Sequence, residues 1–212
     1  MSTYFDTRRD LLTELPRLGA KTTDPETLID RVLRFQSPPT NEEGYHLCRW
    51  IQAEGRQYAE IAHTLVTLRD LRGPAWLGEC VHLFWEALGG PEDSLTASEW
   101  SELFRSAGFR WDGEPSQITQ VPTLYRGATA DRKLRMPWTN SLATARRYAS
   151  SRRGSETGFV WQAQFSTVDV LAVIDFKPHL SRWGVRIHEY IIDPEAVERA
   201  ELAAVETIHD AA

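Results

Sequence analysis

The spacing of apolar residues changes part-way along this chain of 212 residues. In the first half, apolar residues recur every three or four positions, which is the period of an amphipathic helix. After residue 120, short runs such as Phe159–Phe165 alternate between apolar and polar residues, as strands do. Helices followed by strands indicate an α+β fold. We therefore expect a helical region over residues 1–115 and a small, mostly β domain over residues 116–212.

Proline and glycine divide the helical half. Asp24 and Pro25 suit a helix start, and the prolines at 38 and 39 end that helix. Further helices are expected at 40–71, from Gly73 to about 89, and from about Thr96 to Gly108. Their aromatic residues are expected to pack in the core rather than bind a cofactor. These are Trp50, Tyr58, Trp76, Phe84, Trp85, Trp100 and Phe104.

The second half contains four stretches that are typical of strands. They cover residues 121–125, 159–165, 170–174 and 186–192, and a short helix is expected at 141–151. Residues 111–120 are polar and contain glycine and proline, which indicates a connecting segment.

Composition narrows the class of protein. Hydrophobic residues make up 42% and charged residues 25%, close to the average for globular domains. The first residues lack an apolar leader, and no later run is apolar enough to span a membrane. The chain has two cysteines, Cys48 and Cys80, so we do not expect a disulfide framework. We expect a cytoplasmic location instead.

A zinc site is not expected either. The chain has two candidate pairs, His46 with Cys48 and Cys80 with His82. Residues two apart on a helix point to roughly opposite sides, so neither pair can chelate a metal without other ligands. The sequence also lacks the glycine-rich phosphate loops and the hydrolase or metalloprotease motifs.

Positive charge is concentrated in the second half. Residues 121–193 contain 11 Lys and Arg against 6 Asp and Glu, although the whole chain has a net charge of −6. An anionic cofactor or a nucleic acid would meet the most favourable potential there.

Three motifs follow one another in this half. They are Leu124-Tyr125-Arg126-Gly127, then Met136-Pro137-Trp138-Thr139-Asn140-Ser141 leading to Ala145-Arg146-Arg147-Tyr148-Ala149, and finally His188-Glu189-Tyr190-Ile191-Ile192-Asp193-Pro194. Over residues 118–195 this order resembles the bacterial and phage ADP-ribosyltransferase-like proteins of the Arg–Ser–Glu class. The resemblance implies a small split β-sheet domain that uses NAD as its substrate.

The resemblance assigns roles to individual residues. Breaking the bond between nicotinamide and ribose builds positive charge on the ribose, and a carboxylate, here Glu189, would stabilise that charge. Arg126 would bind the pyrophosphate, because a guanidinium matches phosphate oxygens bidentately. Residues around these two would seat the rest of the cofactor. They are Tyr125, Gly127, Trp138, Thr139, Ser141 and Tyr148.

Each of these residues taken alone has an ordinary structural explanation. Arg126 could be a surface residue after a strand, and Tyr148 could belong to the core. Glu189 could lie on the solvent face of an edge strand. Only the joint pattern favours a functional site.

Two positions depart from the family pattern. Pro137 stands where the family has the serine that binds the nicotinamide ribose, so Thr139 or Ser141 would have to replace it. Ser141 also suits the cap of the next helix. Ile187 stands where arginine-modifying members have Glu or Gln, which argues against arginine as the acceptor.

The acceptor therefore remains open between a nucleic acid, another protein group and a small molecule. The basic residues near the motifs favour a nucleic acid. They are Arg146, Arg147, Arg152, Arg153 and Arg186. The resemblance implies a toxin-like or phage-conflict effector that an inhibitor or antitoxin could control. The alternatives are an NAD glycohydrolase at the same site and a non-catalytic domain of this type that serves as a binding module.

Overall fold

The computed structural model describes residues 81–82, 84–86, 91–93, 95–151, 157–176 and 184–208. The chain divides into two compact units, Met1–Gly108 and Phe109–Ala212. The helices expected at 24–36 and 40–71 lie outside the described residues, and the one expected at 73–89 lies mostly outside them.

In the first unit, α6 (Ala97–Ala107) confirms the helix expected between Thr96 and Gly108. It begins with a capping box, in which the Thr96 side chain accepts from the backbone of Glu99 and the Glu99 carboxylate accepts from Thr96. A short 3₁₀ helix, η1 (Pro91–Asp93), precedes it. The Trp100 ring meets Trp85 edge-on, with 5.1 Å between centroids, and both are buried. These aromatic residues are core residues, as expected.

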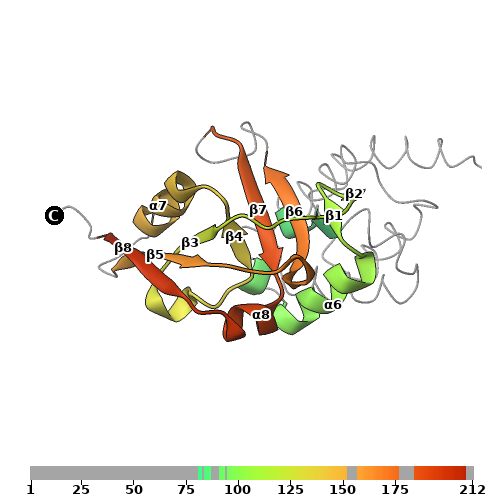
Figure 1. The fold of residues 1–212 in the computed structure, drawn as a ribbon, viewed down its shortest axis with the longest axis horizontal. Helices are drawn as coiled ribbons and strands as arrows, with labels where there is room; N and C mark the ends of the chain where they lie inside the picture. The colour runs from blue at the N-terminus through green and yellow to red at the C-terminus, as the bar shows by residue number, and fades with distance from the viewer. Residues whose placement is uncertain are drawn as a thin grey trace, which may run out of the picture. The chain divides into compact units, whose positions relative to one another are not determined.

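The second unit contains one mostly antiparallel sheet of eight strands in the order β2-β1-β6-β7-β4-β3-β5-β8 (Figure 1). Its one parallel contact joins β1 to β6. The strands are β1 (Arg110–Trp111), β2 (Glu114–Pro115), β3 (Leu124–Ala128), β4 (Pro137–Thr139), β5 (Gly158–Ala163), β6 (Val170–Phe176), β7 (Ile187–Ile192) and β8 (Ala203–Ile208).

The strands expected at 159–165, 170–174 and 186–192 correspond to β5, β6 and β7. The strand expected at 121–125 begins later, at Leu124, and continues through Ala128. Four strands were not expected. β1 and β2 form a short hairpin whose turn residues, Asp112 and Gly113, both have positive φ, which suits a two-residue turn. β4 begins with a proline, and most of β8 is exposed, so neither shows the alternation of a buried strand.

The helix expected at 141–151 is α7 (Leu142–Ser150), and the Ser141 hydroxyl caps it by accepting from Thr144 N at 3.1 Å. It lies directly against β3 and β5 (Figure 1) because two glycines allow the approach. A Cβ at Gly127 would stand 1.9 Å from the Ala145 carbonyl oxygen, and one at Gly158 would stand 2.2 Å from that of Ala149. A side chain at either position would therefore displace α7.

The remaining helices are short and connect strands. They are η2 (Ala130–Arg132), η3 (Thr167–Asp169) and α8 (Pro194–Arg199). α8 follows an Asp193 cap with proline as its first residue, which ends β7 abruptly. Within the described part of the chain, no helix has the length and apolar character needed to cross a membrane.

Candidate active site

Three of the predicted site residues occupy one row across neighbouring strands. In the antiparallel register, Tyr125 of β3 lies opposite Thr139 of β4, and Thr139 lies opposite Glu189 of β7. Side chains that are directly opposite in adjacent strands project from the same face of a sheet. The structure thus brings together an aromatic ring, a hydroxyl and a carboxylate from three different motifs.

Glu189 lies in the interior of the sheet. Its strand, β7, pairs with β6 on one side and β4 on the other, and Ile174 is its partner on β6. The carboxylate residue is half-buried. The interpretation of Glu189 as an edge-strand residue is therefore excluded. A charged residue in an internal strand is unusual, because burying it costs free energy unless it has a partner or a task.

Thr139 and Ser141 have different roles. Ser141 uses its hydroxyl to cap α7. Thr139 is only 4% exposed, and its Oγ1 accepts from Ser141 N at 3.2 Å. A hydroxyl carries one proton besides its acceptor sites, and among the described residues the proton of Thr139 has no acceptor. Of these two hydroxyls, that of Thr139 lies in the row with Glu189.

Gly127 and Tyr148 lie next to this row. Gly127 is two residues beyond Tyr125 on β3 and on the same face, beneath α7. A Cβ there would stand 2.8 Å from Cβ of Tyr148, so the start of that side chain lies close above the glycine. Tyr125 packs against Ala145 and Ala149 of the same helix. The glycine accordingly serves the contact between helix and sheet.

The side chain of Trp138 projects from the other face of the sheet, away from Thr139 and Glu189. Its cross-strand partner on β7 is Tyr190, and Trp138 is 1% exposed within the main hydrophobic cluster. Its ring meets Phe165 edge-on at 5.2 Å, and its Nε1 donates to the Arg135 carbonyl at 3.1 Å. These contacts make Trp138 a core residue. Burial also raises the pKa of the neighbouring Tyr190 hydroxyl.

Arg126 is one residue along from Tyr125, and its partner on β5 is Trp161, so it too projects from the opposite face. Its Nε donates to the Arg132 carbonyl at 3.1 Å, and its Nη1 donates to the Pro137 carbonyl. The guanidinium of Arg126 therefore ties β3 to the middle of the connection that follows it and to the first residue of β4.

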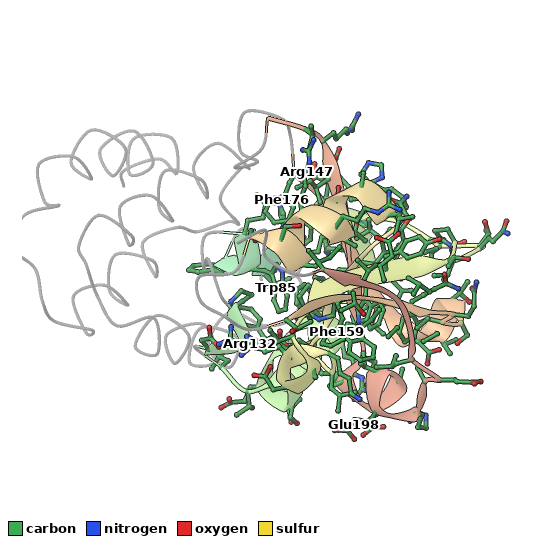
Figure 2. All side chains as sticks on the ribbon, turned by 90° about the vertical axis from the view of Figure 1, so that its left-hand side faces the viewer. Trp85, Arg132, Arg147, Phe159, Phe176 and Glu198 are labelled. Atoms are coloured by element: carbon green, nitrogen blue, oxygen red, sulfur yellow. The ribbon has the colours of Figure 1, made fainter. Side chains whose placement is uncertain are left out.

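The basic residues near the motifs are partly neutralised. Arg186 binds the buried Asp175 carboxylate through Nε, at 2.7 Å to Oδ1, and through Nη2. The hydrogen bond to Asp175 and its charge raise the pKa of Arg186. Arg146 forms a similar pair with Glu206. The side chain of Arg147 is exposed on α7 (Figure 2), whereas Arg152 and Arg153 lie outside the described residues.

Sequence reasoning missed one polar residue of the row, Gln162, which lies opposite Tyr125 on β5. The alternation of β5 shows that Gln162 and Trp161 face opposite ways, but the row is visible only once the strand pairing is known.

The described residues contain no group of three His, Cys, Asp or Glu side chains placed to hold a metal ion. Three members of the cysteine and histidine pairs considered above, His46, Cys48 and Cys80, lie outside the described residues. Comparisons of the chain with known protein families, with curated proteins and with solved structures find no match.

Proposed function

We propose that this protein is an NAD-dependent mono-ADP-ribosyltransferase whose catalytic carboxylate is Glu189. The observation that carries the proposal is the row of Tyr125, Thr139 and Glu189 across three internal strands. These residues come from the three motifs that resemble the Arg–Ser–Glu class, whose split-sheet domain we also propose for this chain. A mostly antiparallel sheet of eight strands is compatible with that fold.

Glu189 would act on the ribose next to nicotinamide. When the glycosidic bond breaks, positive charge develops on the ribose, and a fixed carboxylate at that point stabilises it. The half-buried position of Glu189 supports this role, because reduced solvent access strengthens the attraction between opposite charges. Neighbouring Thr139 would donate its proton to a ribose hydroxyl and so take over from the serine that Pro137 replaces.

Arg126 would act mainly by positioning. Its bonds to the carbonyls of Arg132 and Pro137 fix β4, and with it Thr139, relative to β3. Trp138 would support the site from the core rather than stack on nicotinamide.

The acceptor would be a group other than arginine. Ile187, at the position where arginine-modifying relatives carry Glu or Gln, is apolar and 4% exposed, so it offers no contact to a guanidinium. A nucleic acid or another protein group fits the positive charge of residues 121–193. If water is the acceptor, the same site makes the protein an NAD glycohydrolase.

The test is nicotinamide release from NAD by purified wild type and Glu189→Gln, each with and without cell lysate or RNA. We expect release that falls by a factor of about 100 or more in the variant, the usual effect of losing a preorganised transition-state contact. Equal melting temperatures would show that the variant is folded. Stimulation by one additive identifies the acceptor class, and release without any additive indicates glycohydrolase activity.

No release by the folded wild-type protein under any condition would contradict the enzymatic proposal. The binding-module alternative, which Pro137 favours, would then stand. In cells, an active toxin-like effector that acts in the cytoplasm arrests growth when expressed, and Glu189→Ala relieves the arrest. If the protein is a passive binding module, cells that express wild type and cells that express Glu189→Ala grow equally well.

A further inference from the structure

Asp175 carries a buried carboxylate that has no part in the proposed reaction. It lies near the end of β6, and the residue is 6% exposed. Its oxygens accept from the Arg186 side chain, at 2.7 Å from Nε to Oδ1 and also from Nη2, and His188 Nε2 lies 3.5 Å from Oδ1. Attraction within such a pair offsets the cost of burying the charge only when the geometry is favourable. The pair alone is therefore weak evidence for a gain in stability.

The contacts of Asp175 hold the segment of chain that leads into Glu189. Asp175 is the cross-strand partner of His188, and its neighbour Ile174 is the partner of Glu189. Arg186 and His188 precede Glu189 by three positions and by one position. One carboxylate thus contacts two of the three side chains that come immediately before the proposed catalytic residue.

Strand pairing is one-sided in this segment. β4 pairs with β7 from Glu189 to Ile191, whereas Ile187 and His188 pair, among the described strands, with β6 alone. Glu189 is accordingly the first residue of β7 that has a described strand on each side. A strand end with one neighbour is held less firmly, because its outer N–H and C=O groups have no partner in the ladder. The Asp175 side chain supplies contacts at this point.

We propose that Asp175 is a positioning residue for Glu189: its pair with Arg186 and its contact with His188 fix the start of β7 and so hold the Glu189 carboxylate in place. This inference rests on the proposed function. The side chains of Asp175 and Glu189 project from opposite faces of the sheet, so Asp175 acts through the backbone of β7. A preorganised charge is effective only at a fixed position, and a displacement of about 1 Å can cost about 100-fold in rate.

The experiment measures nicotinamide release and NAD binding at a temperature at which the variants are folded. Asp175→Asn keeps the size of the side chain and removes its charge. Arg186→Gln removes the other half of the pair at a position that is 65% exposed, and it decides the question if Asp175→Asn does not fold. The matched control is Glu206→Gln, which breaks the same kind of pair between β8 and Arg146 of α7.

We expect kcat to fall about tenfold in Asp175→Asn and by a smaller factor in Arg186→Gln. Kd for NAD should stay within about twofold of wild type, because Glu189 stabilises the transition state rather than bound NAD. Glu206→Gln should change kcat and Kd by less than about twofold, because its pair lies outside the segment that leads into Glu189.

A double-mutant cycle separates positioning from general support of the fold. Once Glu189→Gln has removed the carboxylate, Asp175→Asn should lower the residual rate by less than about twofold, because the group that it positions is already absent. The same cycle applies to Arg186→Gln. An equal loss with and without the Glu189 carboxylate would show that Asp175 acts by another route and would overturn the inference.

The inference is also overturned if both pair variants keep the kcat of wild type, or if Glu206→Gln loses as much activity as they do. In each of these cases the proposed function stands, because wild type still releases nicotinamide and Glu189→Gln does not. If folded wild type releases no nicotinamide, the proposed function fails, and this inference fails with it.

Discussion

The two faces of the β3–β4–β7 region differ sharply, although their residues alternate along the same strands. One face presents Tyr125, Thr139 and Glu189 in a row. The other presents Trp138 and Tyr190, buried in the main hydrophobic cluster. A shift of one residue along a strand therefore separates the proposed chemistry from packing. Adjacent residues of one motif need not share a function.

The largest expected effect concerns the packed face. Trp138→Ala removes a fully buried indole and should lower the free energy of unfolding by about 3–5 kcal/mol. Chemical denaturation monitored by circular dichroism measures this loss. The fraction that remains folded should still bind NAD with a Kd close to that of wild type. A variant of normal stability that has lost NAD binding would show instead that Trp138 contacts the ligand.

A smaller loss of stability is expected for the next residue, Thr139, which lies on the polar face. Thr139→Val keeps the shape of the side chain but removes the acceptor of the Ser141 N–H, so it should cost about 1 kcal/mol of stability. In addition, kcat/KM for nicotinamide release should fall about tenfold through the lost ribose contact.

Ser141→Ala is the matched control for Thr139→Val. It removes the cap of α7 and should also cost about 1 kcal/mol. Because Ser141 lies outside the row, its kcat/KM should remain near that of wild type. Equal losses of activity in the two variants would mean that stability, and not position in the row, controls the rate.

The smallest expected effect is on the melting temperature, and it concerns the ion pair between Glu206 of β8 and Arg146 of α7. The hydrogen bond from Arg146 lowers the pKa of the Glu206 carboxyl below its ordinary value. Such a group stabilises the fold above its unfolded pKa, and this contribution disappears as the pH falls through the folded pKa. Glu206→Gln should therefore melt slightly below wild type at pH 7, and the two melting temperatures should converge in acid. A difference that persists at pH 3 would contradict this assignment.

Local signals predicted the elements that depend on local chemistry. The Ser141 cap and the alanines of 142–150 were sufficient for α7, and alternation was sufficient for β5 and β7. β4 was missed because it has three residues and begins with Pro137, and its pairing comes from β3 and β7 rather than from its own pattern. β8 was missed because most of its residues remain exposed.

The candidate site divides in a similar way. The order of the motifs was sufficient to select Tyr125, Thr139 and Glu189 for comparison with a known chemistry. The order of the motifs could not show which side chains project from the same face of the sheet. Strand register decides that, and register depends on contacts between residues that are distant in sequence. Arg126 and Trp138 were therefore grouped with residues that point the other way, and Gln162 was overlooked.

The one parallel pair of the described sheet affects the order in which the protein can assemble. β1 must meet β6, and their partners Arg110 and Ala172 are 62 positions apart (172 minus 110). On the ribosome, the chain emerges from its N-terminus at about 5–20 residues per second. β1 is thus the first strand of the sheet to be synthesised and must wait several seconds before β6 exists. Of its two partners among the described strands, β2 is the one already present to pair with β1 during that interval.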